Sequence, residues 1–173
     1  MHNQNLPDLK LIFRKFLHDL GNISSGVITA VDFVDNNNSD IASNAKLLLS
    51  HSSKLLYSFI KIYHLLLAGT DTYKMKDHIE VLFKYKKIDY SFSDIISVCS
   101  SQSIQYYVLF IYDTMNQGGK IITKDKRIIA VYNNNSHISS SKYADNIWYK
   151  YLSSCNDIKI TCSDDCELSL ESI

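Results

Sequence analysis

The sequence has no excess of charge of either sign. Its 18 lysines and arginines are matched by 18 acidic residues, so the formal net charge is zero. Recognition of nucleic acid or of an anionic membrane surface through electrostatic attraction needs a basic patch, and the lysines here are dispersed among acids. We therefore expect neither nucleic acid nor membrane among the partners.

Long hydrophobic runs are also missing. The two richest apolar stretches, Leu55 to Ala68 and Ile104 to Tyr112, are interrupted or too short to span a bilayer. The polar N-terminus has no apolar stretch of the kind that a secretory signal carries. These features predict a cytoplasmic protein.

Cysteine is scarce, and its spacing is uninformative. The chain has four cysteines, Cys99, Cys155, Cys162 and Cys166, with no C-x-x-C pair and no histidine pair nearby. This spacing disfavours a zinc site and favours reduced, mostly buried thiols. We expect no metal or other cofactor to be bound by this chain.

Two long helical patterns occupy the first 70 residues. Apolar residues recur in alternating steps of four and three over 9–34 and again over 41–66, as in helices that pack on other helices. Ser39 or Asp40 is the expected cap of the second helix, and Gly69 is its expected stop. The short asparagine-rich loop between the patterns predicts an antiparallel helical hairpin. The expected contact residues of the first helix are Leu9, Phe13, Phe16, Leu20, Ile23, Val27, Ala30 and Val34.

The apolar stripe of the second helix is too wide for one partner. Leu49, Leu56, Ile60, Tyr63 and Leu67 extend it beyond the strict contact positions. Two hairpins that associate as a dimeric four-helix bundle would bury this excess, and we expect such a homodimer. The alternative is that the C-terminal half of the chain covers the excess apolar surface of the second helix.

Residues 71–173 are expected to form a second domain, because the hydrophobic period changes after residue 70. The patterns predict helices over 75–87, 104–115 and 142–152, and strands over 88–92, 120–123, 127–132, 157–162 and 167–171. Helices layered on a mostly antiparallel sheet define an α+β domain.

The residues best suited to chemistry lie in the first helix. With Leu9 at heptad position d, His18 falls at f, opposite the contact residues and therefore on solvent. Imidazole is nucleophilic near neutral pH, and Asp19 can orient the ring through Nδ1–H or take up its proton. Asn22, one turn later on the same face, can hydrogen-bond a phosphoryl group. We predict His18, Asp19 and Asn22 as the catalytic residues.

The neighbours of His18 suit the approach of another protein. Gly21 has no side chain, so a partner can approach the helix closely there. Arg14 and Lys15 supply positive charge, which favours an acidic pocket on the partner. With Leu17 and Ser25, these residues form the predicted partner-binding surface.

The nine residues from Arg14 to Asn22, RKFLHDLGN, resemble the phospho-acceptor segment of the dimerisation and histidine-phosphotransfer domains of two-component signalling. The whole layout resembles the ChpT-type histidine phosphotransferases of alphaproteobacteria, in which a kinase-like hairpin precedes a degenerate ATPase-like α/β sandwich. The resemblance implies a homodimer that relays phosphate from the receiver domain of a hybrid histidine kinase to response regulators. It implies His18 as the acceptor, Asp19 and Asn22 in support, and Mg²⁺ bound by the receivers.

A nucleotide-binding version of the second domain would need groups that this sequence lacks. An asparagine for magnesium is missing from the helix expected over 104–115, which offers only Gln105 and Asp113 as polar candidates. After Tyr132 the chain reads NNNSH, without the glycines that let a backbone approach phosphates closely. We therefore expect neither ATP binding nor self-phosphorylation.

The sequence thus predicts a histidine phosphotransferase, with three alternatives. The first is a dimeric adaptor that docks receivers or kinases without taking phosphate. The second is a divergent histidine kinase, which the missing glycines disfavour. The third is a structural coiled-coil dimer in which the placement of Asp19 and Asn22 has no chemical role.

Overall fold

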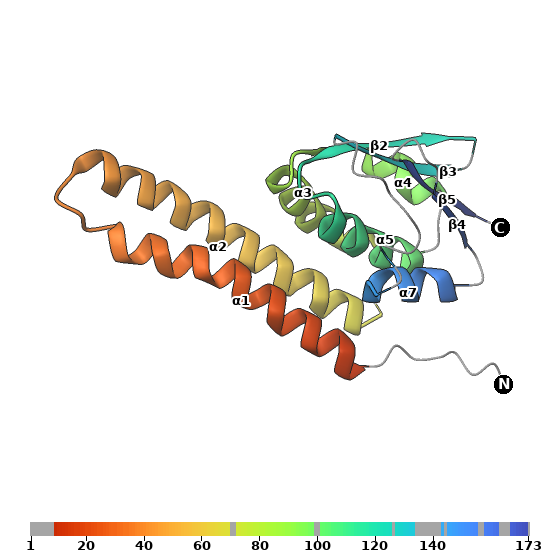
Figure 1. Ribbon diagram of the computed structural model, residues 1–173, viewed down its shortest axis with the longest axis horizontal. Coiled ribbons are helices and arrows are strands. Elements are labelled where there is room, and N and C mark those ends of the chain that lie inside the picture. The colour runs from red at the N-terminus through yellow and green to blue at the C-terminus, as the bar shows by residue number, and fades with distance from the viewer. Residues whose placement is uncertain are drawn as a thin grey trace. The chain divides into compact units, whose positions relative to one another are not determined.

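The computed structural model describes residues 9–69, 72–98, 101–125, 127–133, 143, 145–155, 158–162 and 167–172. The chain is of mixed α and β structure (Figure 1) and divides into two compact units, residues 1–64 and 65–173. Each unit is described by itself below.

The first unit is a helical hairpin. Helix α1 (Leu9–Phe33) and helix α2 (Ser39–Leu67) run side by side in opposite directions (Figure 1), as the two helical patterns predict. The expected caps Ser39 and Asp40 are wrong. Asn38 caps α2 instead, because its Oδ1 accepts hydrogen bonds from the backbone N–H groups of Asp40 (3.0 Å) and Ile41 (3.3 Å).

Gly69 ends α2 as expected. Its φ is +61°, and its N–H donates to the carbonyl of Leu66 at 3.2 Å. A left-handed residue just after the last turn, closing the free carbonyls of a helix, is a common role of glycine.

The face of α1 that packs inward differs from the expected one. The buried residues of α1 are Ile12, Asp19 and Ala30, whereas Leu9 and Phe13 are 63% and 58% exposed. The expected contact through Leu9 and Phe13 is therefore wrong. Helix α1 has two adjacent apolar stripes, and periodicity alone does not determine which of them packs against α2.

Aromatic rings fill the hairpin core near the start of α1. Phe16 stacks on Phe59 with ring centroids 5.9 Å apart, and it contacts Tyr63 at 4.9 Å. Further along, the helices approach closely at Gly26, where a Cβ would lie 3.0 Å from the Oγ of Ser52. Two of the expected contact positions of α2, Ile41 and Leu48, are exposed, at 43% and 44%. The others are buried, namely Ala45, Ser52, Leu55, Phe59, Ile62 and Leu66.

A second apolar stripe of each helix remains at the surface. On α1 it consists of Leu9, Phe13, Ile28 and Val31, all more than 50% exposed, with half-buried Leu20 and Val27. On α2 it includes half-buried Leu49 and Leu56 and exposed Ile60.

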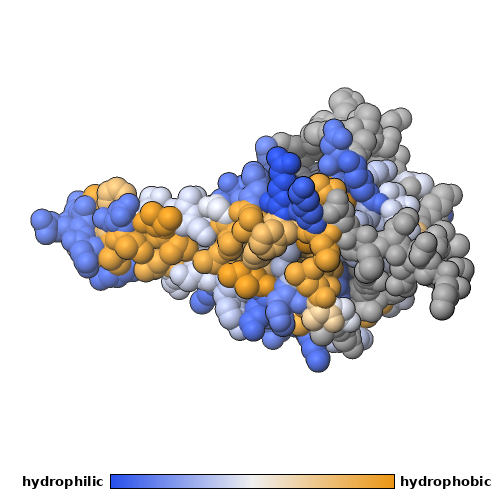
Figure 2. All heavy atoms as spheres, turned by 90° about the horizontal axis from the view of Figure 1, so that it is seen from below, coloured by the Kyte–Doolittle hydropathy of each residue, from blue (hydrophilic) through white to orange (hydrophobic). Residues whose placement is uncertain are grey.

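The two stripes lie on one side of the hairpin. Each is rotated by about 100° in the same sense from the contact face of its helix, at 100° per residue. In an antiparallel pair, equal rotations place both stripes on the same side. Apolar side chains are visible on the hairpin surface in Figure 2. This surface is called the outer apolar face below.

In the residues that the structure describes, the second unit is a layer of helices on a five-stranded sheet. The sheet order is β1-β2-β3-β5-β4, with β1 and β2 parallel and the other pairs antiparallel, which confirms the expected mostly antiparallel sheet. Its elements are η1 (Thr72–Met75), α3 (Lys76–Tyr85), β1 (Ile88–Asp89), α4 (Phe92–Val98), α5 (Ser101–Thr114), β2 (Gly119–Lys124), β3 (Arg127–Tyr132), α7 (Ile147–Ser154), β4 (Ile158–Cys162) and β5 (Glu167–Ser172).

Helix α5 forms the centre of this unit. All its side chains from Ser103 to Tyr112 are buried, which explains why its sequence is apolar all round. On the sheet, Ile121, Ile128 and Ala130 are buried while Lys120, Lys124 and Arg127 are exposed. This alternation places one face of β2 and β3 on the core.

Two expected elements of the second unit are wrong in part. The strand expected over 88–92 is only two residues long, and α4 begins at Phe92. Ser91 accepts the N–H of Ile95 at 3.2 Å, and Ser91-Phe92-Ser93-Asp94 has the Ser-x-x-Asp pattern of a helix start. Of the helix expected over 142–152, residues 142 and 144 lie outside the described part and Tyr143 is helical. Helix α7 begins at Ile147, because Asn146 accepts from the N–H groups of Trp148 (2.9 Å) and Tyr149 (3.2 Å).

Tyr90 has the clearest electrostatic signature of the fold. Burial raises the pKa of Tyr90 to about 12, with further contributions from the negative charges of Glu80 and Asp77. Its ring packs edge-on against Phe83, with centroids 4.8 Å apart. The folded protein therefore keeps the Tyr90 proton at pH values where the unfolded chain, with a tyrosine pKa near 10.0, releases it.

This difference predicts an alkaline loss of stability. Between pH 10 and 12 the unfolded state binds fewer protons than the folded state, so the free energy of unfolding falls as pH rises. Tyr90→Phe should make that fall shallower in urea titrations at pH 9.5 to 12, and Tyr57→Phe, at an exposed site, should not. Equal slopes in wild type and Tyr90→Phe would contradict this account.

Candidate functional site

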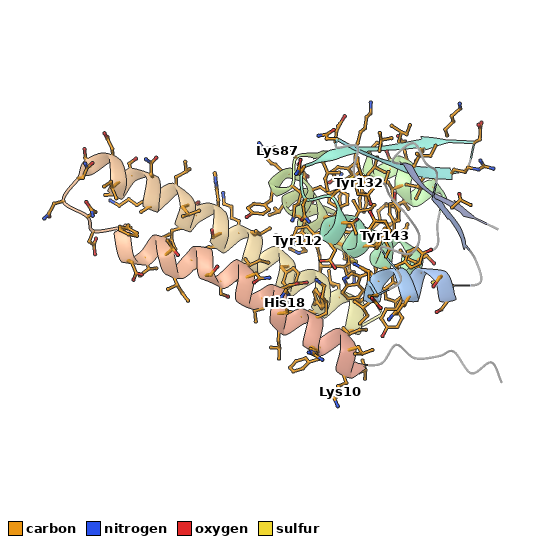
Figure 3. All side chains as sticks on the ribbon, in the orientation of Figure 1. Lys10, His18, Lys87, Tyr112, Tyr132 and Tyr143 are labelled. Atoms are coloured by element: carbon orange, nitrogen blue, oxygen red, sulfur yellow. The ribbon has the colours of Figure 1, made fainter. Side chains whose placement is uncertain are left out.

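The candidate site lies on the exposed surface of α1, at His18 (Figure 3). The His18 side chain is 68% exposed, so a protein partner can reach the ring. His18 is on the side of α1 away from the outer apolar face, because the two directions differ by more than 90° on the helical wheel at 100° per residue. A dimer formed through that face would leave His18 accessible.

Asp19 is directly beside His18 but faces the hairpin interior. The His18 Nδ1 lies 3.0 Å from the Asp19 Oδ1, and the Asp19 side chain is only 11% exposed. The sequence predicts the pairing of these residues but not the burial of the acid. A carboxylate held at the helix contact has little freedom to leave the ring, so it can orient His18 continuously.

Lys15 shares the same carboxylate oxygen. Its Nζ lies 2.8 Å from the Asp19 Oδ1, and its side chain is 24% exposed. Lys15 and Asp19 are four residues apart on the helix, a spacing that favours ion pairs and is visible in the sequence. Sequence reasoning assigned Lys15 to partner binding and missed this pair.

The hydrogen bond to Asp19 sets the chemistry of the imidazole. A carboxylate only accepts, so in the neutral ring Nδ1 carries the proton and Nε2 keeps a lone pair. The Asn22 Nδ2 lies 3.5 Å from the same Nδ1, at the outer limit of a hydrogen bond. The shorter contact to Asp19 therefore dominates, and Nε2 is the ring nitrogen that keeps its lone pair.

The other predicted site residues surround His18 on the surface. Arg14, Leu17, Gly21 and Ser25 are all exposed, at positions −4, −1, +3 and +7 from His18. The Ser25 Oγ donates to the carbonyl of Asn22 at 2.8 Å, which ties Ser25 to the helix backbone. Arg14 and Leu17 thus provide a cationic and an apolar surface beside the His18 ring.

In the second unit, α5 packs against aromatic rings; it is the helix in which a nucleotide-binding version would need an asparagine for magnesium. Tyr106 of α5 stacks on Tyr151 (5.4 Å) and Trp148 (6.4 Å) of α7. Phe110 contacts Tyr143 (5.2 Å) and Tyr149 (5.8 Å). This aromatic cluster covers the face of α5 that is turned toward α7.

The polar candidates of α5 have structural roles. Gln105 is buried, and the Oδ2 of Asp113 accepts a hydrogen bond from the Asn146 Nδ2 at 3.3 Å. Asn146 in turn caps α7. Asp113 therefore supports a helix start.

The two adjacent glycines form a turn, as expected. Gly118 has φ +77° and leads into β2, which begins at Gly119. A Cβ on Gly119 would lie 2.3 Å from the backbone oxygen of Val131, so glycine is needed there for strand packing.

Within the described residues, no group of three or more histidine, cysteine or acidic side chains could hold a metal ion. Cys155 is half-buried, and its Sγ donates to the carbonyl of Tyr151 at 3.3 Å. The side chains of Cys99, Cys162 and Cys166 lie outside the described part. Among the helices that the structure describes, none has both the length and the apolar character to cross a bilayer.

Comparison with known proteins gives no family for this chain. No family model matches it, and no curated protein matches it at a significant level. The geometry of the site is therefore the basis of the function proposed below.

A substitution at Gly21 tests whether the glycine beside His18 lowers the stability of α1. Nothing lies within 4 Å of a Cβ added at Gly21, so Gly21→Ala should raise the free energy of unfolding by about 0.5–1 kcal/mol. Urea titration measures this change. Gly26→Ala is the matched control in the same helix and should gain less, because its Cβ would meet Ser52. A loss of stability in Gly21→Ala would refute the interpretation.

Proposed function

We propose that the protein is a homodimeric histidine phosphotransferase that relays phosphate between receiver domains. The observation that carries the proposal is the exposed His18 ring, whose Nδ1 lies 3.0 Å from the nearly buried carboxylate of Asp19. A histidine that stores a phosphoryl group needs both access for large partners and a defined nucleophilic nitrogen.

The proposed reaction uses Nε2 as the acceptor atom. The Nε2 lone pair attacks the phosphorus of an aspartyl phosphate on the donor receiver. An N–P bond forms, the P–O bond to the donor carboxylate breaks, and that carboxylate leaves with the electron pair. Asp19 offsets the positive charge that develops on the ring, because its Oδ1 accepts from Nδ1. The reverse sequence on an acceptor aspartate completes the relay.

The surrounding residues take supporting roles. Asn22 is placed one turn from His18 and can hydrogen-bond the phosphoryl oxygens. Arg14, Lys15, Leu17, Gly21 and Ser25 form the docking surface for receivers, and the receivers bring their own Mg²⁺. We place the relay in the cytoplasm, between a hybrid histidine kinase and response regulators.

The second unit is proposed to be a degenerate relative of the histidine-kinase ATPase domain. Support comes from the aromatic rings packed on α5 and from the absence of glycine in the sequence that follows Tyr132. Without nucleotide chemistry, phosphate has to reach His18 from a partner. A divergent histidine kinase that phosphorylates itself with ATP is therefore disfavoured.

The transfer itself tests the proposal. When the protein is mixed with a labelled phospho-receiver, label should move to wild type and to His51→Ala, an exposed histidine of α2, but not to His18→Ala. The physical reason is that only His18 combines exposure with the Asp19 contact. Transfer to His18→Ala would contradict the assignment, and full partner function in His18→Gln would favour an adaptor.

The proposed dimer has its own test. Burial of the outer apolar face predicts twice the chain mass in sedimentation equilibrium. Val31→Asp, at a 53% exposed position of that face, should shift the protein to the chain mass because it buries a charge without a partner. Thr29→Asp, exposed on the other side of α1, should stay dimeric. Wild type at the mass of a single chain would rule the dimer out.

A further inference from the structure

Two donors meet on a single oxygen at the candidate site. The Lys15 Nζ lies 2.8 Å and the His18 Nδ1 lies 3.0 Å from the Asp19 Oδ1. Lys15 is 24% exposed and reaches from the exposed surface of α1 toward the nearly buried acid. A cation that served only to attract a partner would have no reason to be held inward in this way.

We propose that Lys15 is a positioning residue that holds the Asp19 carboxylate against His18 Nδ1 and thereby determines which ring nitrogen is free to take phosphate. The inference deepens the proposed function and rests on it. It changes the role of Lys15, which the sequence places among the partner-binding charges.

Burial of the Asp19 carboxylate carries a free-energy cost. A carboxylate that is 11% exposed loses most of its hydration, and a paired cation with a hydrogen bond offsets that loss. Lys15 supplies the cation from the preceding helical turn. The pair therefore holds the Asp19 carboxylate at the position where it accepts from His18.

The second step is a competition at Nδ1. Asp19 approaches Nδ1 as an acceptor at 3.0 Å, and the Asn22 Nδ2 approaches it as a donor at 3.5 Å. An acceptor requires a proton on Nδ1, whereas a donor requires a lone pair there, so the two contacts favour opposite tautomers. With Asp19 held in place, the proton stays on Nδ1 and the lone pair on Nε2.

Loss of Lys15 should reverse that balance. If Asp19 turns away, the Asn22 amide becomes the remaining partner of Nδ1, and the proton moves to Nε2. Nε2 then lacks the lone pair that attacks phosphorus. The hairpin itself should remain folded, since Lys15 lies outside the aromatic core formed by Phe16, Phe59 and Tyr63.

The experiment compares wild type, Lys15→Met, Lys15→Arg and the control Lys46→Met, which removes a charge from an exposed site on α2. Nitrogen-15 NMR of the histidine rings reports the tautomer of His18, assigned against His18→Gln, and far-ultraviolet circular dichroism reports the helices. Label transfer from a phosphorylated receiver gives the rate.

The expected result is a protonated Nδ1 in wild type, Lys15→Arg and Lys46→Met. In Lys15→Met the ring should shift to the Nε2-protonated tautomer, and transfer should slow roughly tenfold to a hundredfold. Lys15→Arg should keep the wild-type tautomer and transfer rate, because an arginine can bond the same carboxylate.

An unchanged tautomer in Lys15→Met would overturn the inference, even if transfer slows, since slow transfer alone would then report docking. Loss of the Nδ1-protonated tautomer of His18 in both Lys15→Met and Lys15→Arg would also overturn the inference. If wild type takes no label, the proposed phosphotransfer fails, while the ring tautomer still decides the role of Lys15.

Discussion

The contact between His18 and Asp19 is the interaction on which the functional account depends. An exposed histidine alone is unremarkable, and a buried carboxylate alone is a cost to stability. Together they give a ring that is 68% exposed yet anchored at one nitrogen by an acid that is 11% exposed. The helix makes this possible because neighbouring residues point about 100° apart, so one faces solvent while the next reaches the contact with α2.

The hairpin separates its packing surface from its chemical surface. Phe16, Asp19, Gly26 and Ala30 turn toward α2, whereas His18, Gly21 and Ser25 stay exposed. The outer apolar face lies on the far side from His18. A second copy could cover that face while both histidines remain open to a receiver, which is the arrangement that a relay between large domains requires.

The sequence was most informative where one strong pattern determined the structure. The extents of α1 and α2, the left-handed Gly69 and the exposed position of His18 all followed from periodicity and local residue preferences. The β2–β3 hairpin followed from alternation around the turn at Asp125, whose φ is +52°. These features depend on residues close together in the chain.

The sequence-based predictions failed where one segment fitted two structural patterns or where a contact depended on side-chain conformation. Two apolar stripes on α1 left the inward face ambiguous, and burial of Asp19 on that face could not be read from an H-D pair. Helix α4 was missed because Ile88 to Phe92 alternates like a strand, although the Ser91–Asp94 pattern marked a helix start. The Lys15–Asp19 pair was available from its spacing, but its contact with His18 depends on rotamers that only the structure supplies.

The account's central claim is that His18 Nε2 carries the phosphoryl group. The most direct measurement is phosphorus and nitrogen NMR of nitrogen-15-labelled protein after incubation with a phosphorylated receiver. The account predicts a one-bond phosphorus–nitrogen coupling at Nε2 of His18. Phosphate on Nδ1, on another histidine, or on no histidine at all would contradict it.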